Sequence, residues 1–145
     1  MNSAFVALAC VILVNSALFA QEIKKCDGAV IQYAQAKAGK LTKSDMKNFM
    51  LTFGKECDNN VEFSEFSNEV LFLVLSRQTK LTLKTIEKEE TQLDLEAILD
   101  DLSAPISDTV LVEKILIKAK KLKMESRLKK RIVESLNTAA RLTEP

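Results

Sequence analysis

The 145-residue sequence contains no histidine and no tryptophan, and it has only three glycines and two prolines. Without histidine the chain cannot form a Ser-His or Cys-His nucleophile pair, and the commonest zinc ligand is missing. Few glycines and prolines favour long helices joined by short turns over a sheet. These absences exclude most familiar hydrolase and metalloenzyme sites and predict an all-helical protein.

An excess of charge of one sign is also missing, because 21 lysines and arginines face 20 aspartates and glutamates. No overall field therefore draws the chain toward nucleic acid or a membrane. Any electrostatic recognition has to come from the local distribution of charge.

The N-terminal segment 1–20 contains no charged side chain. Its apolar run Phe5–Val14 has the length of a signal-peptide core, and small residues follow it. We expect cleavage after Ala20, with Ala17 as the second choice. A membrane anchor is the alternative, but a spanning helix needs about 20 apolar residues and this run is shorter. The sequence predicts an exported protein, periplasmic or secreted, with a signal peptide at 1–20 and a single helical domain at 21–145.

Two cysteines, Cys26 and Cys57, lie in the predicted mature chain. Predicted helices at 23–38 and 43–53 are joined by a short connection, so the start of the first should lie beside the end of the second. The cysteines occupy these two places, and an oxidising compartment favours their pairing. The sequence predicts a disulfide, with two free buried thiols as the alternative. The spacing is not the Cys-x-x-Cys of a catalytic redox pair.

Apolar residues at helical spacing predict the rest of the fold. The run 70–75 is apolar on every side, so a helix at about 61–77 should be the most buried, with a short strand as the competing interpretation. Weaker helical patterns begin at Leu81 and Leu93, and further helices are expected at about 109–123 and 125–142. The predicted fold is all-α, a compact bundle of five or six helices.

The segment 54–65 resembles a degenerate EF-hand calcium loop followed by its exiting helix. Carboxylate and carbonyl oxygens suit a hard cation such as Ca²⁺. Glycine replaces the expected first aspartate at position 54, and asparagine replaces the turn glycine at position 59. An ordinary polar turn is the favoured interpretation, and calcium binding is the alternative. The ligands in that alternative would be Glu56, Asp58, Asn60, Glu62 and Glu65.

Charge is uneven along the chain although its total is balanced. Residues 87–101 hold seven acids and one base, whereas residues 114–131 hold nine bases and one acid. Lys114, Lys118 and Lys121 share one face of a predicted helix, where an anionic partner could bind. Export and the lack of aromatics among these bases disfavour nucleic acid, and a membrane surface is a less favoured partner than a protein. The competing interpretation is a solvated face lying near the acidic segment of the same molecule.

The run 17–21 and the segment 59–72, with 105–108 downstream, resemble small exported helical proteins of Bacteroidetes-type bacteria. The resemblance implies export and helicity, and nothing about activity. We therefore expect a non-enzymatic protein-interaction or structural module with no catalytic residues and no cofactor, whose partner is a protein. Binding of calcium or of a small apolar ligand is the alternative function.

Overall fold

The computed structural model describes residues 24–106 and 110–142. In these residues the chain forms six α-helices and two short 3-10 turns without any strand, which confirms the predicted all-α fold. The predicted signal peptide at 1–20 lies outside the described residues. The helices are α1 (Gly28–Ala36), α2 (Lys43–Leu51), α3 (Val61–Glu89), α4 (Leu95–Ser103), α5 (Val110–Lys121) and α6 (Ser126–Leu142), with 3-10 turns η1 (Lys55–Cys57) and η2 (Glu90–Gln92).

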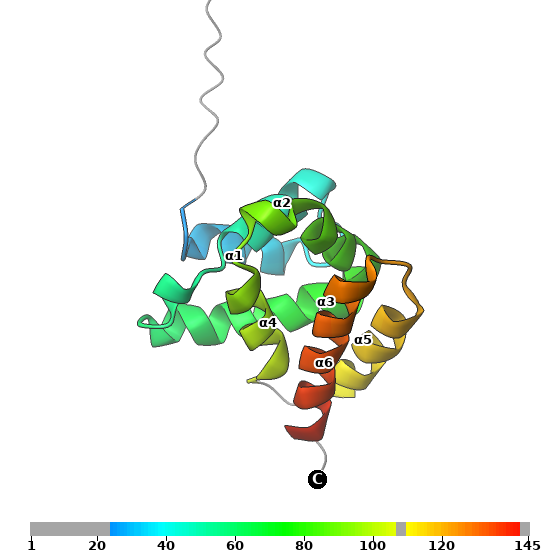
Figure 1. The fold of residues 1–145 in the computed structure, drawn as a ribbon. Helices are drawn as coiled ribbons and strands as arrows, with labels where there is room; N and C mark the ends of the chain where they lie inside the picture. Colours follow the sequence, from blue (N-terminus) through cyan, green and yellow to red (C-terminus); the bar gives the residue numbers. More distant parts are fainter. Residues whose placement is uncertain (1–23, 107–109, 143–145) are drawn as a thin grey trace, which may run out of the picture.

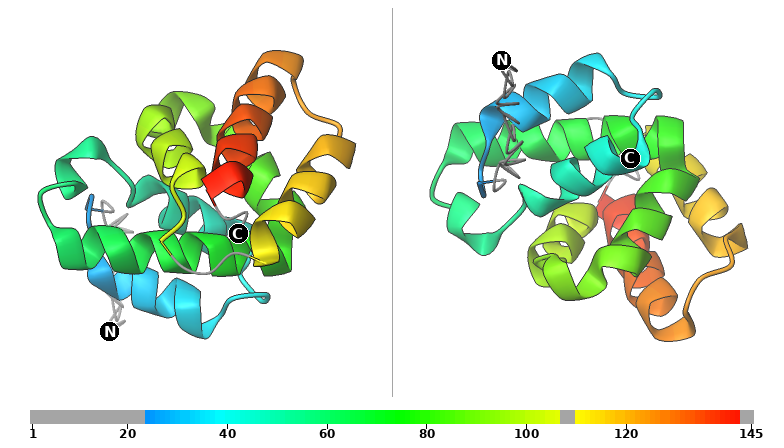
Figure 2. Two further views of the ribbon diagram at one scale, coloured as in Figure 1. Left: turned by 90° about the horizontal axis from the view of Figure 1, so that it is seen from below. Right: turned by 90° about the horizontal axis from the view of Figure 1, so that it is seen from above.

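Helix α3 lies in the middle of the molecule, between two groups of shorter helices (Figures 1 and 2). Helices α1 and α2 pack against one side of α3, while α4 and α5 contact it from the other side. Helix α6 packs against α4 and α5 and closes the second group. The buried side chains of all six helices form one continuous apolar cluster, as expected for a chain of this size.

Helices α1 and α2 form an antiparallel hairpin. The chain turns between them at Gly39, whose φ of 91° is a left-handed conformation that glycine adopts without steric cost. Thr42 and Asp45 cap the start of α2 reciprocally, as a capping box. Helix α1 begins at Gly28, later than predicted, because Cys26 has a non-helical φ of 59° and Asp27 accepts hydrogen bonds as the N-cap.

The predicted pairing of Cys26 and Cys57 is confirmed. The two Cα atoms lie 5.5 Å apart and the sulfurs are bonded across 31 residues of sequence. The N–H of Cys26 also donates to the carbonyl of Thr52 at 2.8 Å, and the N–H of Asp27 donates to the Thr52 hydroxyl at 2.8 Å. The start of α1 is therefore held beside the end of α2 by one covalent bond and two hydrogen bonds.

Helix α3 is kinked at Gln78, where φ is −132° and ψ is 43°. The sequence predicts a helix ending at Arg77 and a new helical stretch from Leu81, and the kink lies between them. The Gln78 side chain accepts a hydrogen bond from the N–H of Leu41 and donates one to its carbonyl, both at 3.0 Å. This pairing fixes the kink against the connection between α1 and α2.

Hydroxyl groups near the kink donate to backbone carbonyls of α3, a pattern that accompanies bent helices. Thr79 donates to the carbonyl of Leu75 at 2.6 Å, and Thr82 donates to that of Gln78 at 3.0 Å. Before the kink, the apolar run 70–75 is helical and buried except for the half-buried Leu73, so the competing strand interpretation is wrong. The enclosed segment 70–75 therefore ends just before the kink, and exposed side chains such as Lys80 and Lys88 follow it.

Side-chain hydrogen bonds to the backbone hold α4 against α3 and cap the turn between α5 and α6. The Asn68 side chain donates to the carbonyls of Asp101 and Ala104 and accepts from the N–H of Ile106, which ties the end of α4 to α3. In the turn between α5 and α6, Lys129 donates to two carbonyls at the end of α5, while the Glu125 carboxylate accepts from two N–H groups at the start of α6. Helix ends that would otherwise leave backbone groups without partners are thus satisfied by side chains.

Candidate functional site

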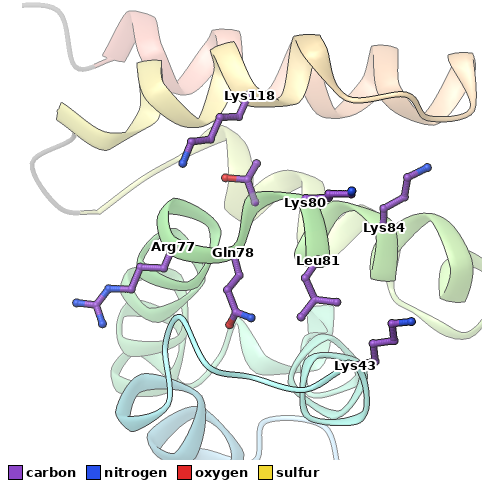
Figure 3. Close-up of a pocket in the computed structure, with 8 residues that line it drawn as sticks. Lys43, Arg77, Gln78, Lys80, Leu81, Lys84 and Lys118 are labelled. Carbon is purple, nitrogen blue, oxygen red and sulfur yellow. The ribbon is translucent and has the colours of Figure 1, made fainter.

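A pocket of about 660 Å³ opens where α3 bends. We call it the kink pocket, and Figure 3 shows its lining. Its volume falls in the range of ligand-binding pockets, which measure roughly 300–1,000 Å³. Three helices contribute the side chains: α2 supplies one, α5 supplies one, and the two sides of the kink in α3 supply the rest. The lining residues are Lys43, Arg77, Gln78, Thr79, Lys80, Leu81, Lys84 and Lys118.

Five of the eight residues that line the kink pocket are cationic, and none is acidic. Lys43 and Lys80 are exposed and have no ion-pair partner among the described residues. Arg77 donates a hydrogen bond to the carbonyl of Ala38, and Lys118 donates one to the carbonyl of Ser76, both at 3.2 Å. A carbonyl accepts a hydrogen bond but does not neutralise a cation, so four of the five charges remain uncompensated.

An adjoining hollow of about 540 Å³ shares Lys43, Leu81 and Lys84 with the kink pocket. Two carboxylates line it, and lysines hold both in place. Glu87 accepts from Lys84 at 2.6 Å, and this bond lowers the pKa of the Glu87 carboxyl, helped by the N–H of Glu125. The hollow therefore sets two carboxylates against four lysines, whereas the kink pocket has no carboxylate at all.

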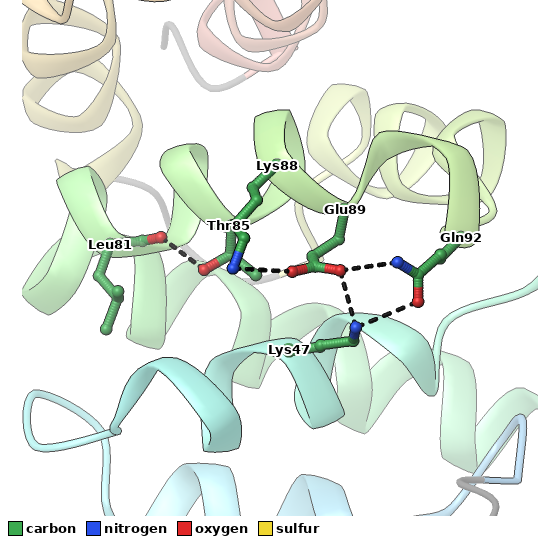
Figure 4. A network of polar contacts seen from close by, with 6 residues as sticks. All are labelled: Lys47, Leu81, Thr85, Lys88, Glu89 and Gln92. Atoms are coloured by element: carbon green, nitrogen blue, oxygen red, sulfur yellow. Dashed lines mark hydrogen bonds and ion pairs between the residues drawn. The ribbon is translucent and has the colours of Figure 1, made fainter.

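Glu89 is the other carboxylate of the hollow, and it is 6% exposed (Figure 4). Lys47 donates to it at 2.7 Å, Lys88 lies 3.6 Å away, and Gln92 donates at 2.9 Å. The bond from Lys47 holds the pKa of Glu89 below its usual value, against the opposing effect of burial. A buried carboxylate with three partners is satisfied, so it fastens α2 to the end of α3 and is not available to a ligand.

The basic face predicted on α5 consists of Lys114, Lys118 and Lys121, and all three side chains are exposed. Only Lys118 lines the kink pocket. No described carboxylate forms an ion pair with these three lysines. The acidic segment reaches a different helix instead, where Arg131 of α6 binds Glu96 at 2.6 Å. The acidic segment of the same molecule therefore neutralises a cation of α6 but none of these three lysines of α5.

The segment that resembles a calcium loop forms η1 and the first turn of α3. The side chain of Asn60 accepts from the N–H of Phe63 as the N-cap of α3, while Glu56, Asp58, Glu62 and Glu65 are exposed. Among the described residues no group of three or more acidic, cysteine or histidine side chains is placed to hold a metal ion. The arrangement is that of a capped turn, and it supplies no argument for calcium.

Asp101 differs from the other carboxylates because its pKa is raised from 3.8 to about 6. Burial is the main cause, the negative charges of Asp58 and Asp100 add to it, and the Asn68 side chain opposes it. A raised carboxyl pKa can mark an acid catalyst. Asp101 lines neither the kink pocket nor the adjoining hollow, so it is not part of this candidate site.

Sequence reasoning found one residue of the kink pocket, Lys118, and missed its other cations. A signal was present, because Arg77, Lys80 and Lys84 follow each other at spacings of three and four and interrupt the apolar pattern. Lys43 carried no such signal, since it reaches the pocket only through the packing of α2 against α3. The kink pocket is thus a product of tertiary structure.

No helix in the described part of the chain combines the length and the apolar character needed to cross a bilayer. No protein-family model matches the chain, and no curated protein or solved structure matches it significantly.

Proposed function

We propose that this protein is an exported, non-catalytic interaction module that binds an anionic partner protein at the kink pocket and the adjoining basic face of α5. The observation that carries the proposal is the pocket lining, in which five cations meet without any carboxylate. Like charges gathered in a concave site raise the local concentration of a partner of opposite charge. The net charge of the chain is only +1, so the attraction comes from the local cluster and not from the chain as a whole.

Export is part of the proposal, and two features support it. The segment 1–20 has the pattern of a signal peptide, and the Cys26–Cys57 disulfide suits an oxidising compartment. Secretion of the tagged full chain, with a mature N-terminus at Gln21, would support this part. Retention of residues 1–20 in the recovered protein would contradict it.

The non-catalytic part rests on chemistry that the chain lacks. There is no histidine, the lining of the kink pocket holds no carboxylate base, and its one hydroxyl, that of Thr79, donates to the carbonyl of Leu75. Lysine and arginine groups that face a partner provide attraction and orientation. Binding, rather than turnover, is the property to measure.

The test measures the affinity of the purified mature protein for a short, fluorescently labelled polyglutamate peptide. Fluorescence anisotropy reports binding, and the measurement is repeated at increasing salt concentration. The double charge reversal Lys43→Glu with Lys80→Glu should weaken binding at least about tenfold at low salt, because two attractive charges become repulsive. Both residues are exposed, and neither makes an ion pair in the described structure.

The matched control is Lys123→Glu with Arg127→Glu. These residues are exposed, lie outside the kink pocket, and change the net charge by the same amount. As in the test pair, one of the two substitutions lies in the first turn of a helix. If both double variants weaken binding equally, only net charge matters and the proposed site is wrong. Binding that is indifferent to salt would also contradict the proposal.

A further inference from the structure

The kink pocket has a divided layout that says more about its partner than charge alone. Figure 3 shows the side chains of Lys43, Lys80 and Lys84 pointing to one side of the pocket, while that of Arg77 points to the other. Lys118 extends from α5 above the pocket, also toward the Arg77 side. The cations therefore form two groups at opposite sides and do not converge on one point.

Between the two groups lies Leu81, an apolar side chain that packs on the core but stays partly exposed. The aliphatic stems of the neighbouring lysines extend the apolar surface around it. Gln78, next to it, is already occupied by both of its bonds to Leu41. The middle of the pocket consequently offers apolar contact and no free polar group from Gln78, while its sides offer positive charge.

We propose that the kink pocket recognises a short acidic segment of a partner protein in which an apolar residue is flanked on both sides by carboxylates. The apolar residue rests on Leu81, and the carboxylates on either side meet Lys43 and Lys80 or Arg77 and Lys118, whereas Lys84 stays bonded to Glu87. This inference rests on the proposed function, to which it adds the order of residues in the partner.

Other anions fit the pocket less well. No aromatic residue lines it, so bases of a nucleic acid would find no stacking surface. A membrane surface is bound by an apolar helix face that enters the lipid, whereas Leu81 lies in a hollow between α2 and α3. A single compact anion would leave one of the two groups of cations unused.

The experiment measures the affinity of the mature protein for three polyglutamate peptides of equal length. The first has a leucine at its centre, the second has a serine there, and the third has the leucine at one end. The central-leucine peptide should bind roughly fivefold to tenfold more tightly than the other two, because only it brings an apolar side chain between two acidic arms. The comparison is repeated with Leu81→Ala and with Leu81→Met.

Leu81→Ala should remove the preference for the central leucine while leaving binding of the serine peptide nearly unchanged. Leu81→Met should keep the preference, which separates a lost contact from a disturbed fold. Circular dichroism and thermal unfolding of each variant report whether it folds. A preference that survives in folded Leu81→Ala would overturn the inference.

The possible failures are distinguishable. If all three peptides bind equally well and charge reversal abolishes binding, the residue order is wrong while the proposed function stands. If no acidic peptide binds, both fail. If vesicles of anionic lipid bind more tightly than the peptides and depend on Lys43 and Lys80, the partner is a membrane and this inference is overturned.

Discussion

The two helical hairpins that flank α3, α1–α2 and α5–α6, are held closed by different interactions. In the α1–α2 hairpin both helices have nine residues, and α1 buries only Ile31 and Ala34. In the α5–α6 hairpin the helices have 12 and 17 residues, and α6 buries four side chains along its length. The first hairpin is closed by the Cys26–Cys57 disulfide, and the second is closed by packing and by the side-chain caps of its turn.

The difference in helix length between the two hairpins explains why only the first is closed by a covalent bond. Isolated helices shorter than about 12–15 residues are marginal in water, so α1 depends on what it is attached to. A disulfide removes freedom from the unfolded chain, and here it holds α1, which buries only two side chains, beside α2, which buries three. The longer α5–α6 hairpin gains its stability from apolar burial against α3 and α4.

The largest expected effect comes from removing packing in the second hairpin. Leu136 is fully buried in α6, so Leu136→Ala should lower the free energy of unfolding by about 2–5 kcal/mol. Urea denaturation followed by circular dichroism measures it. Leu142→Ala, at a side chain that is 66% exposed, is the control and should change stability by less than about 0.5 kcal/mol. Equal effects at the two positions would show that α6 is not held by burial.

Loss of the disulfide should be the next largest effect. The double substitution Cys26→Ser with Cys57→Ser should cost about 2–4 kcal/mol, because the unfolded chain regains the freedom of a 31-residue separation. Hydrogen exchange should show loss of protection in α1 and α2 before α6. Uniform loss of protection across all six helices would mean that the two hairpins do not differ in the proposed way.

The Asp101 carboxyl, in α4, makes the stability of the protein depend on pH. Its folded pKa of about 6 lies above the ordinary 3.8, so between these values the folded state binds more protons than the unfolded state. Its contribution to stability is therefore favourable at low pH and is lost as the pH rises from about 4 to about 6, by roughly 2 kcal/mol.

The matched variant is Asp101→Asn, which keeps the shape and removes the titration. It should be more stable than the parent chain at pH 7, and the difference should shrink toward zero near pH 4. The lowered pKa values of Glu87 and Glu89 act in the opposite direction and cancel from this comparison. A difference that stays constant with pH would disprove the role of the Asp101 carboxyl.

The smallest expected effect concerns the ion pair between the α4 and α6 surfaces. Arg131 and Glu96 lie 2.6 Å apart with side chains 32% and 58% exposed. Arg131→Gln should cost at most about 1 kcal/mol, and salt should reduce the cost further, because water screens exposed pairs. A loss comparable to that of Leu136→Ala would mean that charge, and not burial, holds α6 in place.

The order and type of the helices could be predicted because apolar periodicity is a local property of the chain. The disulfide could be predicted because a short connection implies an antiparallel hairpin. The start of α1 could not, since it depends on the left-handed backbone at Cys26. The kink pocket could not either, because Lys43, Lys80 and Lys118 come from three helices that meet only after folding.

The turn between α5 and α6 has a consequence for how the molecule folds. Lys129 and Glu125 satisfy the facing helix ends using partners no more than nine residues away in sequence. Contacts of such short range cost little loop-closure entropy, so this corner can form early, before the N–H of Glu125 reaches Glu87 of α3. The α1–α2 hairpin, in contrast, is completed by sulfurs 31 residues apart. We therefore expect folding to begin at the C-terminal corner and to finish with oxidation at the N-terminal one.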